Sequence, residues 1–294
     1  MNQAGAGPDG VWPVDRLLAA YLFISGSALL FPFRPDSWLV LAALHVAGIA
    51  LLLRWGPAGR AVSAVAQHMG KGSAVLHHWL PLVLMPALYA ELAVLNVAIY
   101  DGAYFDRLIV AAEQFVFGAQ PSREWAMAAG SAWLSEALHS AYISYYLIIY
   151  GPPLLLFIAG RRAEFRTMVL AMMATFLIHY IFFIYFPVQG PRYDYPSPVP
   201  QSGRGPVWEL TQQILNAGAS RGAAFPSSHV GVAFAQTISV YYVKRSLAPA
   251  MALLSLGLAA GAVYGGFHYL TDAVCGLVLG SCITLLVWRR ARQP

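Results

Sequence analysis

The sequence predicts an all-α protein, a polytopic bundle of membrane-spanning helices that forms a single membrane domain. Two observations carry this prediction. Of the 294 residues, 59% are hydrophobic and only 11% are charged, against roughly 25% charged in ordinary soluble domains. Apolar segments near the ~20 residues that a helix needs to cross a bilayer also recur along the chain. Because lipid offers the backbone no hydrogen-bond partners, each segment is expected to be helical.

Eight segments of the sequence fit this description. They fall at 16–33, 37–54, 79–99, 141–160, 167–186, 226–243, 247–266 and 270–288. The first two flank a short turn at Arg34-Pro35-Asp36, so a re-entrant pair is an alternative to two full spans. The third contains Pro81 and Pro86 and is therefore expected to bend.

The cations outside these segments predict the topology. Eight crossings place twelve Lys and Arg on the side of both termini, against six on the other side. Positive charge accumulates on the cytoplasmic side, so we expect a cytoplasmic (inner) membrane protein with both termini in the cytoplasm. The net charge of +5 is thus a topology signal, and the sequence shows no basic soluble face of the kind that binds nucleic acid. We expect no nucleic-acid partner.

Two regions interrupt the pattern of spans and short loops. Residues 100–140 are predicted to form amphipathic helices on the extracytoplasmic surface, because charged and apolar residues alternate there at helical spacing. The simplest interpretation of Asp106, Arg107 and Glu113 is a solvated helix face, and a role in shaping the roof of a site is the alternative. A long loop rich in Pro and Gly covers 187–225, and loops of this length tend to be functional or disordered.

These regions divide the membrane domain into three predicted parts. Residues 1–99 hold the N-terminal spans and the first core helix, and 100–140 hold the surface helices. Residues 141–294 form the catalytic membrane core.

The strongest chemical signal is a pair of residues at the start of the last span. His268 and Asp272 are four residues apart and therefore share a helix face. The carboxylate can hold one imidazole nitrogen and leave the other free, as a nucleophile or a base requires. A second histidine, His229, opens the sixth segment on the same side of the membrane. Ionisable groups at such positions are functional by default, so these three residues are the catalytic candidates.

The stretch before His229 is typical of a helix N-terminus, which binds anions. A phosphate held there would meet the imidazole, the hydroxyls of Ser227 and Ser228, and nearby arginines, for which Arg192 and Arg221 are the candidates. The histidines and carboxylates lack the spacing of metal ligands. We therefore expect no metal and no cofactor.

The two histidine motifs, Phe-Pro-Ser-Ser-His229 and His268-Tyr-Leu-Thr-Asp272, resemble the second and third signature motifs of the type-2 phosphatidic acid phosphatase superfamily. Within it, the stretch from Asp106 to Pro121 and the segment Gly190-Pro-Arg-Tyr193 resemble the inositol phosphorylceramide synthase branch and its bacterial relatives. The resemblance covers roughly 100–288. It implies a six-helix core, to which the first two spans are an addition.

The resemblance also implies a mechanism and partners. His268 would attack phosphorus, Asp272 would hold the tautomer of its imidazole, and His229 would protonate the leaving oxygen. Water or an alcohol would then take the phosphoryl group from His268. The implied partners are the lipid bilayer, a phospholipid or lipid-phosphate substrate and, for a transferase, an alcohol or polyol acceptor.

The sequence departs from the phosphatase branch at its phosphate-binding cations. Gly261 and Ala262 stand where that branch has a Ser-Arg pair, and Tyr185 stands at the position of its lysine. Either other residues compensate, or the site accepts a less highly charged diester, which favours a transferase acting on phospholipid head groups. The residues that would compensate are Arg221, Arg204, Tyr193 and Tyr264.

Three functions stay open at this stage. We favour an integral membrane lipid phosphotransferase with an extracytoplasmic site. A lipid phosphate phosphatase of the same superfamily is the first alternative, and a lipid transporter without catalysis is the second.

Overall fold

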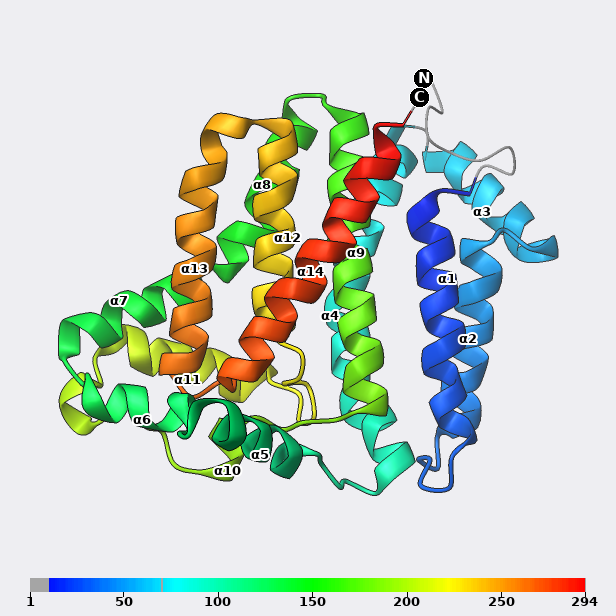
Figure 1. The fold of residues 1–294 in the computed structure, drawn as a ribbon. Coiled ribbons are helices and arrows are strands. Elements are labelled where there is room, and N and C mark those ends of the chain that lie inside the picture. The colour runs from blue at the N-terminus through cyan, green and yellow to red at the C-terminus, as the bar shows by residue number, and fades with distance from the viewer. Residues whose placement is uncertain (1–10, 70, 294) are drawn as a thin grey trace.

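The computed structural model describes residues 11–69 and 71–293, and this part of the chain is built from helices (Figure 1). A single isolated β-bridge, between Val188 and Ala223, joins two of its loops. The all-α prediction is confirmed.

Eight helices make up the upright bundle, and each overlaps one predicted segment. They are α1 (Pro13–Gly26), α2 (Trp38–Leu52), α4 (Lys71–Tyr100), α8 (Tyr145–Ile158), α9 (Arg162–Tyr185), α12 (Ser228–Val243), α13 (Ala248–Tyr264) and α14 (Leu270–Ala291). The others are α3 (Gly56–Met69), α5 (Asp106–Phe117), α6 (Pro121–Ala128), α7 (Ala132–Ile143), α10 (Pro191–Asp194) and α11 (Pro206–Gly218). Short 3-10 turns cover Ser27–Leu30, Gln201–Gly203 and Arg245–Leu247.

Six segments of the described chain are long and apolar enough to cross a membrane. They are Pro13–Leu30, Val75–Tyr100, Ala132–Ile158, Arg162–Tyr185, Arg245–Tyr264 and Leu270–Ala291. The remaining two predicted spans are shorter than expected. Helix α2 forms an apolar pair with α3 that is bent by 64°, and α12 has only 16 residues. Helices α1 and α2 stand side by side as an upright antiparallel pair (Figure 1).

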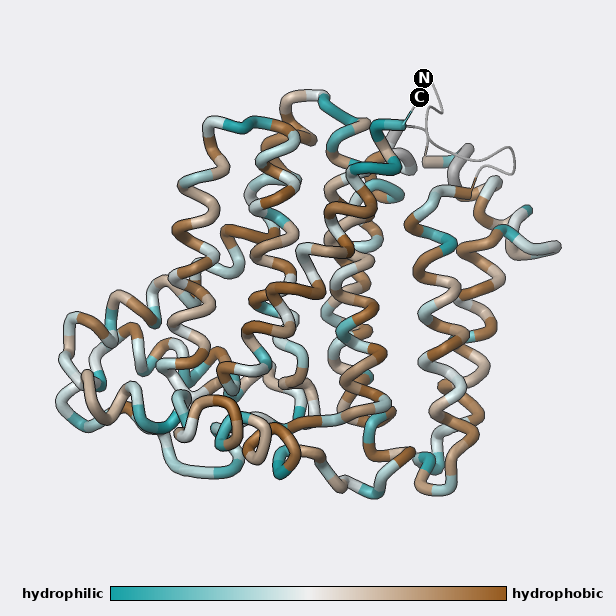
Figure 2. The backbone as a smooth tube through the Cα atoms, viewed as in Figure 1, coloured by the Kyte–Doolittle hydropathy of each residue, from teal (hydrophilic) through white to brown (hydrophobic). Residues whose placement is uncertain are grey.

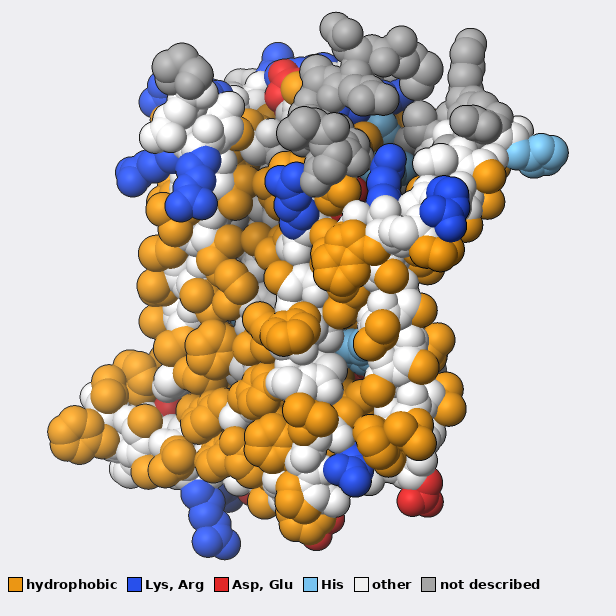
Figure 3. Space-filling view, turned by 90° about the vertical axis from the view of Figure 1, so that its right-hand side faces the viewer, with side chains coloured by type: hydrophobic (Ala, Val, Ile, Leu, Met, Phe, Trp, Pro, Cys, Tyr) orange, Lys and Arg blue, Asp and Glu red, His pale blue; other side chains and the backbone are white. Residues whose placement is uncertain are grey.

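The surface of the bundle has the character of a membrane protein. Hydrophobic residues fill the middle of the upright helices, and hydrophilic residues gather at the two ends (Figure 2). Large apolar side chains are exposed around this belt, including Phe23, Ile158 and Leu253, each more than 70% exposed. Lys and Arg side chains concentrate at the end that holds the termini (Figure 3). The chain is therefore an integral membrane protein.

Helices α12 and α14 lie in direct backbone contact, and two glycines make this possible. A Cβ on Gly276 would lie 2.2 Å from the carbonyl oxygen of Ser227, and one on Gly280 would lie 2.2 Å from that of Gly231. Small residues four apart are the usual means by which membrane helices approach this closely. The contact brings the start of α12 against the start of α14, where the Ser227 N–H donates to the carbonyl of Asp272 at 2.9 Å.

The end of the bundle opposite the termini is covered by short helices. Helices α5, α6, α10 and α11 lie there beneath the upright helices (Figure 1). Two of these, α5 and α6, fall within the predicted surface region of 100–140. The third helix of that region, α7, leads into α8 to form the apolar segment Ala132–Ile158.

Candidate active site

Two histidines meet where α12 and α14 begin. Ser227 is the N-cap of α12 and accepts a hydrogen bond from the Val230 N–H at 3.4 Å, which places His229 in the first turn. His268 lies in the loop between α13 and α14. The centroids of the two imidazoles are 5.7 Å apart, and their planes cross at 56°. Both rings are therefore close enough to contact the same small anion.

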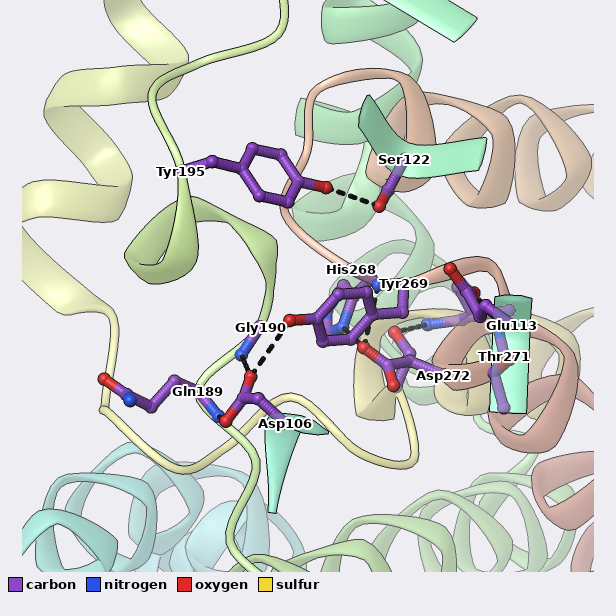
Figure 4. A network of polar contacts seen from close by, with 12 residues as sticks. Asp106, Glu113, Ser122, Gln189, Gly190, Tyr195, His268, Tyr269, Thr271 and Asp272 are labelled. Atoms are coloured by element: carbon purple, nitrogen blue, oxygen red, sulfur yellow. Dashed lines mark hydrogen bonds and ion pairs between the residues drawn. The ribbon is translucent and has the colours of Figure 1, made fainter. Parts of the chain in front are cut away.

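Asp272 fixes the second of these rings. Its Oδ2 lies 3.5 Å from Nδ1 of His268 and accepts the N–H of Tyr269 at 2.9 Å. The residue is fully buried in the first turn of α14 (Figure 4). Because the carboxylate faces Nδ1, the lone pair that can react belongs to Nε2.

The site is shielded from water by aromatic side chains. The His229 ring packs against Tyr145 at 4.5 Å and Tyr142 at 5.5 Å between centroids. Phe267 lies 4.8 Å from Tyr142. Nδ1 of His229 is buried without a hydrogen-bond partner within the described structure. A dry setting of this kind strengthens electrostatic interactions with a bound anion.

Burial also sets the protonation state of His268, which is only 4% exposed. The pKa of its imidazole is lowered to about 4 by desolvation, against a smaller opposing effect of a hydrogen bond to the Ala224 backbone. His268 is therefore neutral at pH 7, which is the form that a nucleophile requires.

Two of the predicted arginines gather around Tyr193. The Arg192 and Arg221 guanidinium groups lie 5.3 and 4.9 Å from the centre of the Tyr193 ring. Arg192 donates from one terminal nitrogen to Asn216 Oδ1 at 2.8 Å, while its other terminal nitrogen is buried without a partner among the described residues. Arg192 is also within electrostatic reach of Tyr142, which packs on His229. A cation with an unused donor thus lies on the His229 side.

Comparison with known proteins identifies the family. A family model described as the PAP2 superfamily matches residues 107–286, which is more than half of the chain. The chain belongs to the PAP2 superfamily. No curated protein and no solved structure shows significant similarity to it. The predicted superfamily is thereby confirmed, while the inositol phosphorylceramide synthase branch stays a prediction.

PAP2 proteins are lipid phosphatases or phosphotransferases, so membership supports an enzyme that acts on lipid phosphates within a bilayer. The matched range contains His229, His268 and Asp272. Within residues 11–69 and 71–293, no group of three or more His, Cys, Asp or Glu side chains is placed to hold a metal ion.

Two phosphate-binding cations of the phosphatase branch have no counterpart here. At the Ser position of its Ser-Arg pair, a Cβ on Gly261 would lie 2.2 Å from the Leu138 carbonyl oxygen, and at the Arg position Ala262 is fully buried and uncharged. Tyr185 donates its hydroxyl to the Ile24 carbonyl at 2.7 Å and therefore points toward α1. Neither position supplies a group to the histidines.

Some predicted binding residues have other partners. The Tyr264 hydroxyl donates to the Ala129 carbonyl at 3.2 Å, and its buried ring packs on Trp125. Arg204 donates to the Val199 carbonyl at 3.1 Å. The Ser227 hydroxyl is engaged as the helix cap, and Ser228 is buried beside it. The structure therefore brings Arg192, Tyr193 and Arg221 together but does not bring Tyr264 or Arg204 to the histidines.

Two acidic residues that sequence reasoning assigned to a solvated face instead hold the site together. Asp106 accepts the N–H groups of Gln189 and Gly190, both at 2.9 Å, and the hydroxyl of Tyr269 at 3.2 Å (Figure 4). Glu113 is fully buried and accepts the Thr271 N–H at 2.8 Å. That interpretation was wrong for both, because loop 187–190 and the start of α14 fold over α5. Only Arg107 is exposed as expected.

The substitution Asp106→Asn is expected to lower the apparent melting temperature by roughly 5 °C. An amide has one acceptor oxygen where the carboxylate has two, so one backbone N–H loses its partner at a cost of about 1–3 kcal/mol. Each kcal/mol lost lowers the melting temperature of a domain of this size by about 2–4 °C. Thermal unfolding in detergent measures the change. Asp101→Asn, in the exposed turn before α5, is the matched control, and an equal shift in both variants would contradict the assigned role.

Proposed function

We propose that this chain is an integral membrane lipid phosphotransferase that moves a phosphoryl or phospho-head-group through a covalent phosphohistidine at His268. The observation that supports it best is the pairing of His268 with Asp272, with the His229 ring 5.7 Å away. The pair presents a neutral, oriented nucleophile, and the second ring lies where a leaving oxygen would need a proton.

The first half of the reaction forms the enzyme adduct. The Nε2 lone pair of His268 attacks phosphorus, and the bond from phosphorus to the lipid oxygen breaks. His229 gives a proton to that oxygen from its protonated form, which the negative charge of the bound phosphate favours, while Asp272 stabilises the positive imidazolium through Nδ1. The unused donor of Arg192 would bind a non-bridging oxygen, where negative charge develops.

The second half regenerates the enzyme. An acceptor hydroxyl attacks the phosphorus on His268, and the P–N bond breaks. The proton of that hydroxyl passes to His229, which is then ready to act as an acid again. With water as acceptor, the same steps make a lipid phosphatase.

The scarcity of cations supports the transferase version. A phosphate monoester carries about two negative charges near pH 7, whereas a diester carries one. Within the described chain, Ala262 and Tyr185 stand at cation positions and carry no charge, and Arg192 and Arg221 lie together beside Tyr193. Fewer cations suit the singly charged diester of a phospholipid head group.

Acceptor dependence tests this choice. Purified protein in detergent is given a phospholipid donor with and without added alcohol or polyol acceptors, and both the released and the transferred head group are measured. Turnover that requires the acceptor supports the transferase. Equal turnover in its absence would identify a phosphatase and overturn the proposal.

The pH dependence of adduct formation gives a further prediction. With a pKa of about 4 for His268, the neutral form dominates above pH 4, and protonation removes the nucleophile as the pH falls below that value. Protonation of His268 should therefore lower the rate of phosphohistidine formation by about tenfold per pH unit only below about pH 4, while a loss of rate at higher pH would report deprotonation of His229. Single-turnover rates between pH 3 and 8 measure it. An acid limb at the ordinary histidine pKa of about 6.5 would contradict the burial argument.

We also propose that the termini are cytoplasmic and that the site opens on the extracytoplasmic face. The concentration of Lys and Arg at the terminal end of the bundle supports this orientation (Figure 3). Single cysteines at the exposed positions Arg34 and Arg289, at opposite ends of the bundle, test it in intact cells. A membrane-impermeant thiol reagent should label the first and spare the second.

A further inference from the structure

A groove lies at the end of the bundle opposite the histidines, between α12, α13 and α14. It encloses about 450 Å³. Its lining is almost entirely apolar and aromatic and includes Ile238, Tyr241, Tyr242, Arg245, Ala252 and Leu285. Cavities of this size and character accommodate hydrocarbon chains.

Two arginines without carboxylate partners in the described part of the chain pack on tyrosines that line this groove. The Arg245 guanidinium lies 5.1 Å from the centre of the Tyr241 ring. Arg292 lies 4.6 Å from that of Tyr242 and donates to its carbonyl at 2.8 Å. Both guanidinium groups contact aromatic rings, and Arg292 also binds a backbone oxygen. None of these partners neutralises their positive charge.

The surrounding sequence leaves this charge unopposed. Residues 237–293 contain one acid, Asp272, which lies at the far end of α14 beside His268. The cations of the same stretch are Lys244, Arg245, Arg289, Arg290 and Arg292. A ligand that fits this end of the groove must therefore carry negative charge above an apolar tail.

We propose that the groove binds one anionic phospholipid, with an acyl chain along Ile238, Ala252 and Leu285 and its phosphate at Arg245. Long cationic side chains at the ends of membrane helices lie at the level of lipid head groups. A lysine or arginine near the surface contributes about 1 kcal/mol to the binding of anionic lipid. A zwitterionic lipid would gain less, because its own cation opposes the arginines.

This lipid is distinct from any reaction substrate. Tyr242 follows His229 by thirteen residues on the same helix, and at 1.5 Å per residue the two are separated by about 20 Å. The lipid comes from the leaflet opposite the one that reaches the histidines. The proposal therefore holds whether or not the catalytic proposal does.

Lipid binding to delipidated protein in a neutral detergent tests it. The probes are dioleoyl phosphatidylglycerol and dioleoyl phosphatidylcholine, with retention measured by native mass spectrometry and affinity by the shift in melting temperature. Phosphatidylglycerol should bind more tightly. Arg245→Gln should weaken its binding roughly fivefold, the equivalent of 1 kcal/mol, and Ala252→Phe should weaken it by obstructing the groove.

Two controls sharpen the test. Arg289→Gln makes the same change of charge at an exposed site on α14 outside the groove lining and should change affinity less than twofold. Arg245→Lys, which keeps the charge, should retain binding. Three results would overturn the proposal: equal affinity for the two lipids, equal weakening by Arg289→Gln and Arg245→Gln, or the same thermal shift with glycerol 3-phosphate alone. Unchanged binding in Ala252→Phe would overturn the placement of the acyl chain.

Discussion

His268→Ala is expected to abolish turnover, with a loss of roughly 10⁴-fold or more, because it removes the atom that attacks phosphorus. His268 has both a buried carboxylate, that of Asp272 at 3.5 Å, and the imidazole of His229 beside it. His229→Ala should cost a smaller factor, about 10²–10⁴, because it removes proton transfer and leaves the nucleophile in place. Initial rates on a phospholipid donor with saturating acceptor measure both.

A buried histidine elsewhere in the chain provides the control for this prediction. His45 on α2 is buried and bonds the Leu41 carbonyl and the Ser25 hydroxyl, on the side of the bundle formed by α1 and α2. His45→Gln should keep activity within a few-fold once the amount of folded protein is normalised by gel filtration and melting temperature. Activity of His268→Ala above about 1% of wild type would remove His268 from the role of nucleophile.

The second large effect is expected from the contact between α12 and α14. Gly276→Val should either prevent folding or lower activity by at least about 10²-fold. The added Cβ would lie 2.2 Å from the Ser227 oxygen, so the helices must separate, and misplacing reacting groups by about 1 Å costs this much. Separation would carry His229 away from His268, because one ring is anchored to each helix.

A glycine with room around it shows whether the effect is specific. Gly151 lies inside α8, and a Cβ there would meet Leu147 at an ordinary 3.4 Å. Gly151→Ala should leave melting temperature and activity close to wild type, whereas Gly276→Ala should lower both. Equal behaviour of the two alanine variants would show that the close approach of α12 and α14 is not required.

The local pattern of the sequence was sufficient to predict much of the fold and the catalytic candidates. Apolar run length located the helices, and the four-residue spacing of His268 and Asp272 predicted the pairing that the structure shows. The predicted shared helix face was wrong, because His268 lies in the loop before the N-cap Tyr269. The placement of His229 beside His268 was predictable from topology, since both open helices on the same side of the bundle. These features depend on neighbours in sequence or on which end of a helix a residue occupies.

The remaining features depend on contacts between distant segments. Asp106 binds the backbone at 189 and 190, and Glu113 binds that of Thr271, pairings that no local pattern encodes. Their spacing of seven residues, two helical turns, was the available signal that both lie on one face. Tyr264 was predicted to compensate for a missing phosphate-binding cation, yet its hydroxyl binds the Ala129 carbonyl after α6.

Helix α12 is shorter than the predicted sixth span for a physical reason. Its 16 residues fall short of a full crossing, and the apolar segment 226–243 includes Pro226 and the N-cap Ser227, which precede the helix. Helix α12 is enclosed by α8, α9, α13 and α14. A helix surrounded by protein does not have to match the bilayer thickness by itself.

Direct detection of the adduct on His268 is the most decisive measurement. The protein is incubated with a phospholipid labelled with ³²P in the head-group phosphate, quenched, digested and analysed by mass spectrometry, without acceptor so that the intermediate accumulates. We expect acid-labile, base-stable label on the peptide that contains His268, and none in His268→Ala. The mechanism would be contradicted if the wild-type protein turned over its lipid without forming this label, or if the label lay on another residue. A protein that moves lipid with neither label nor turnover would be a transporter.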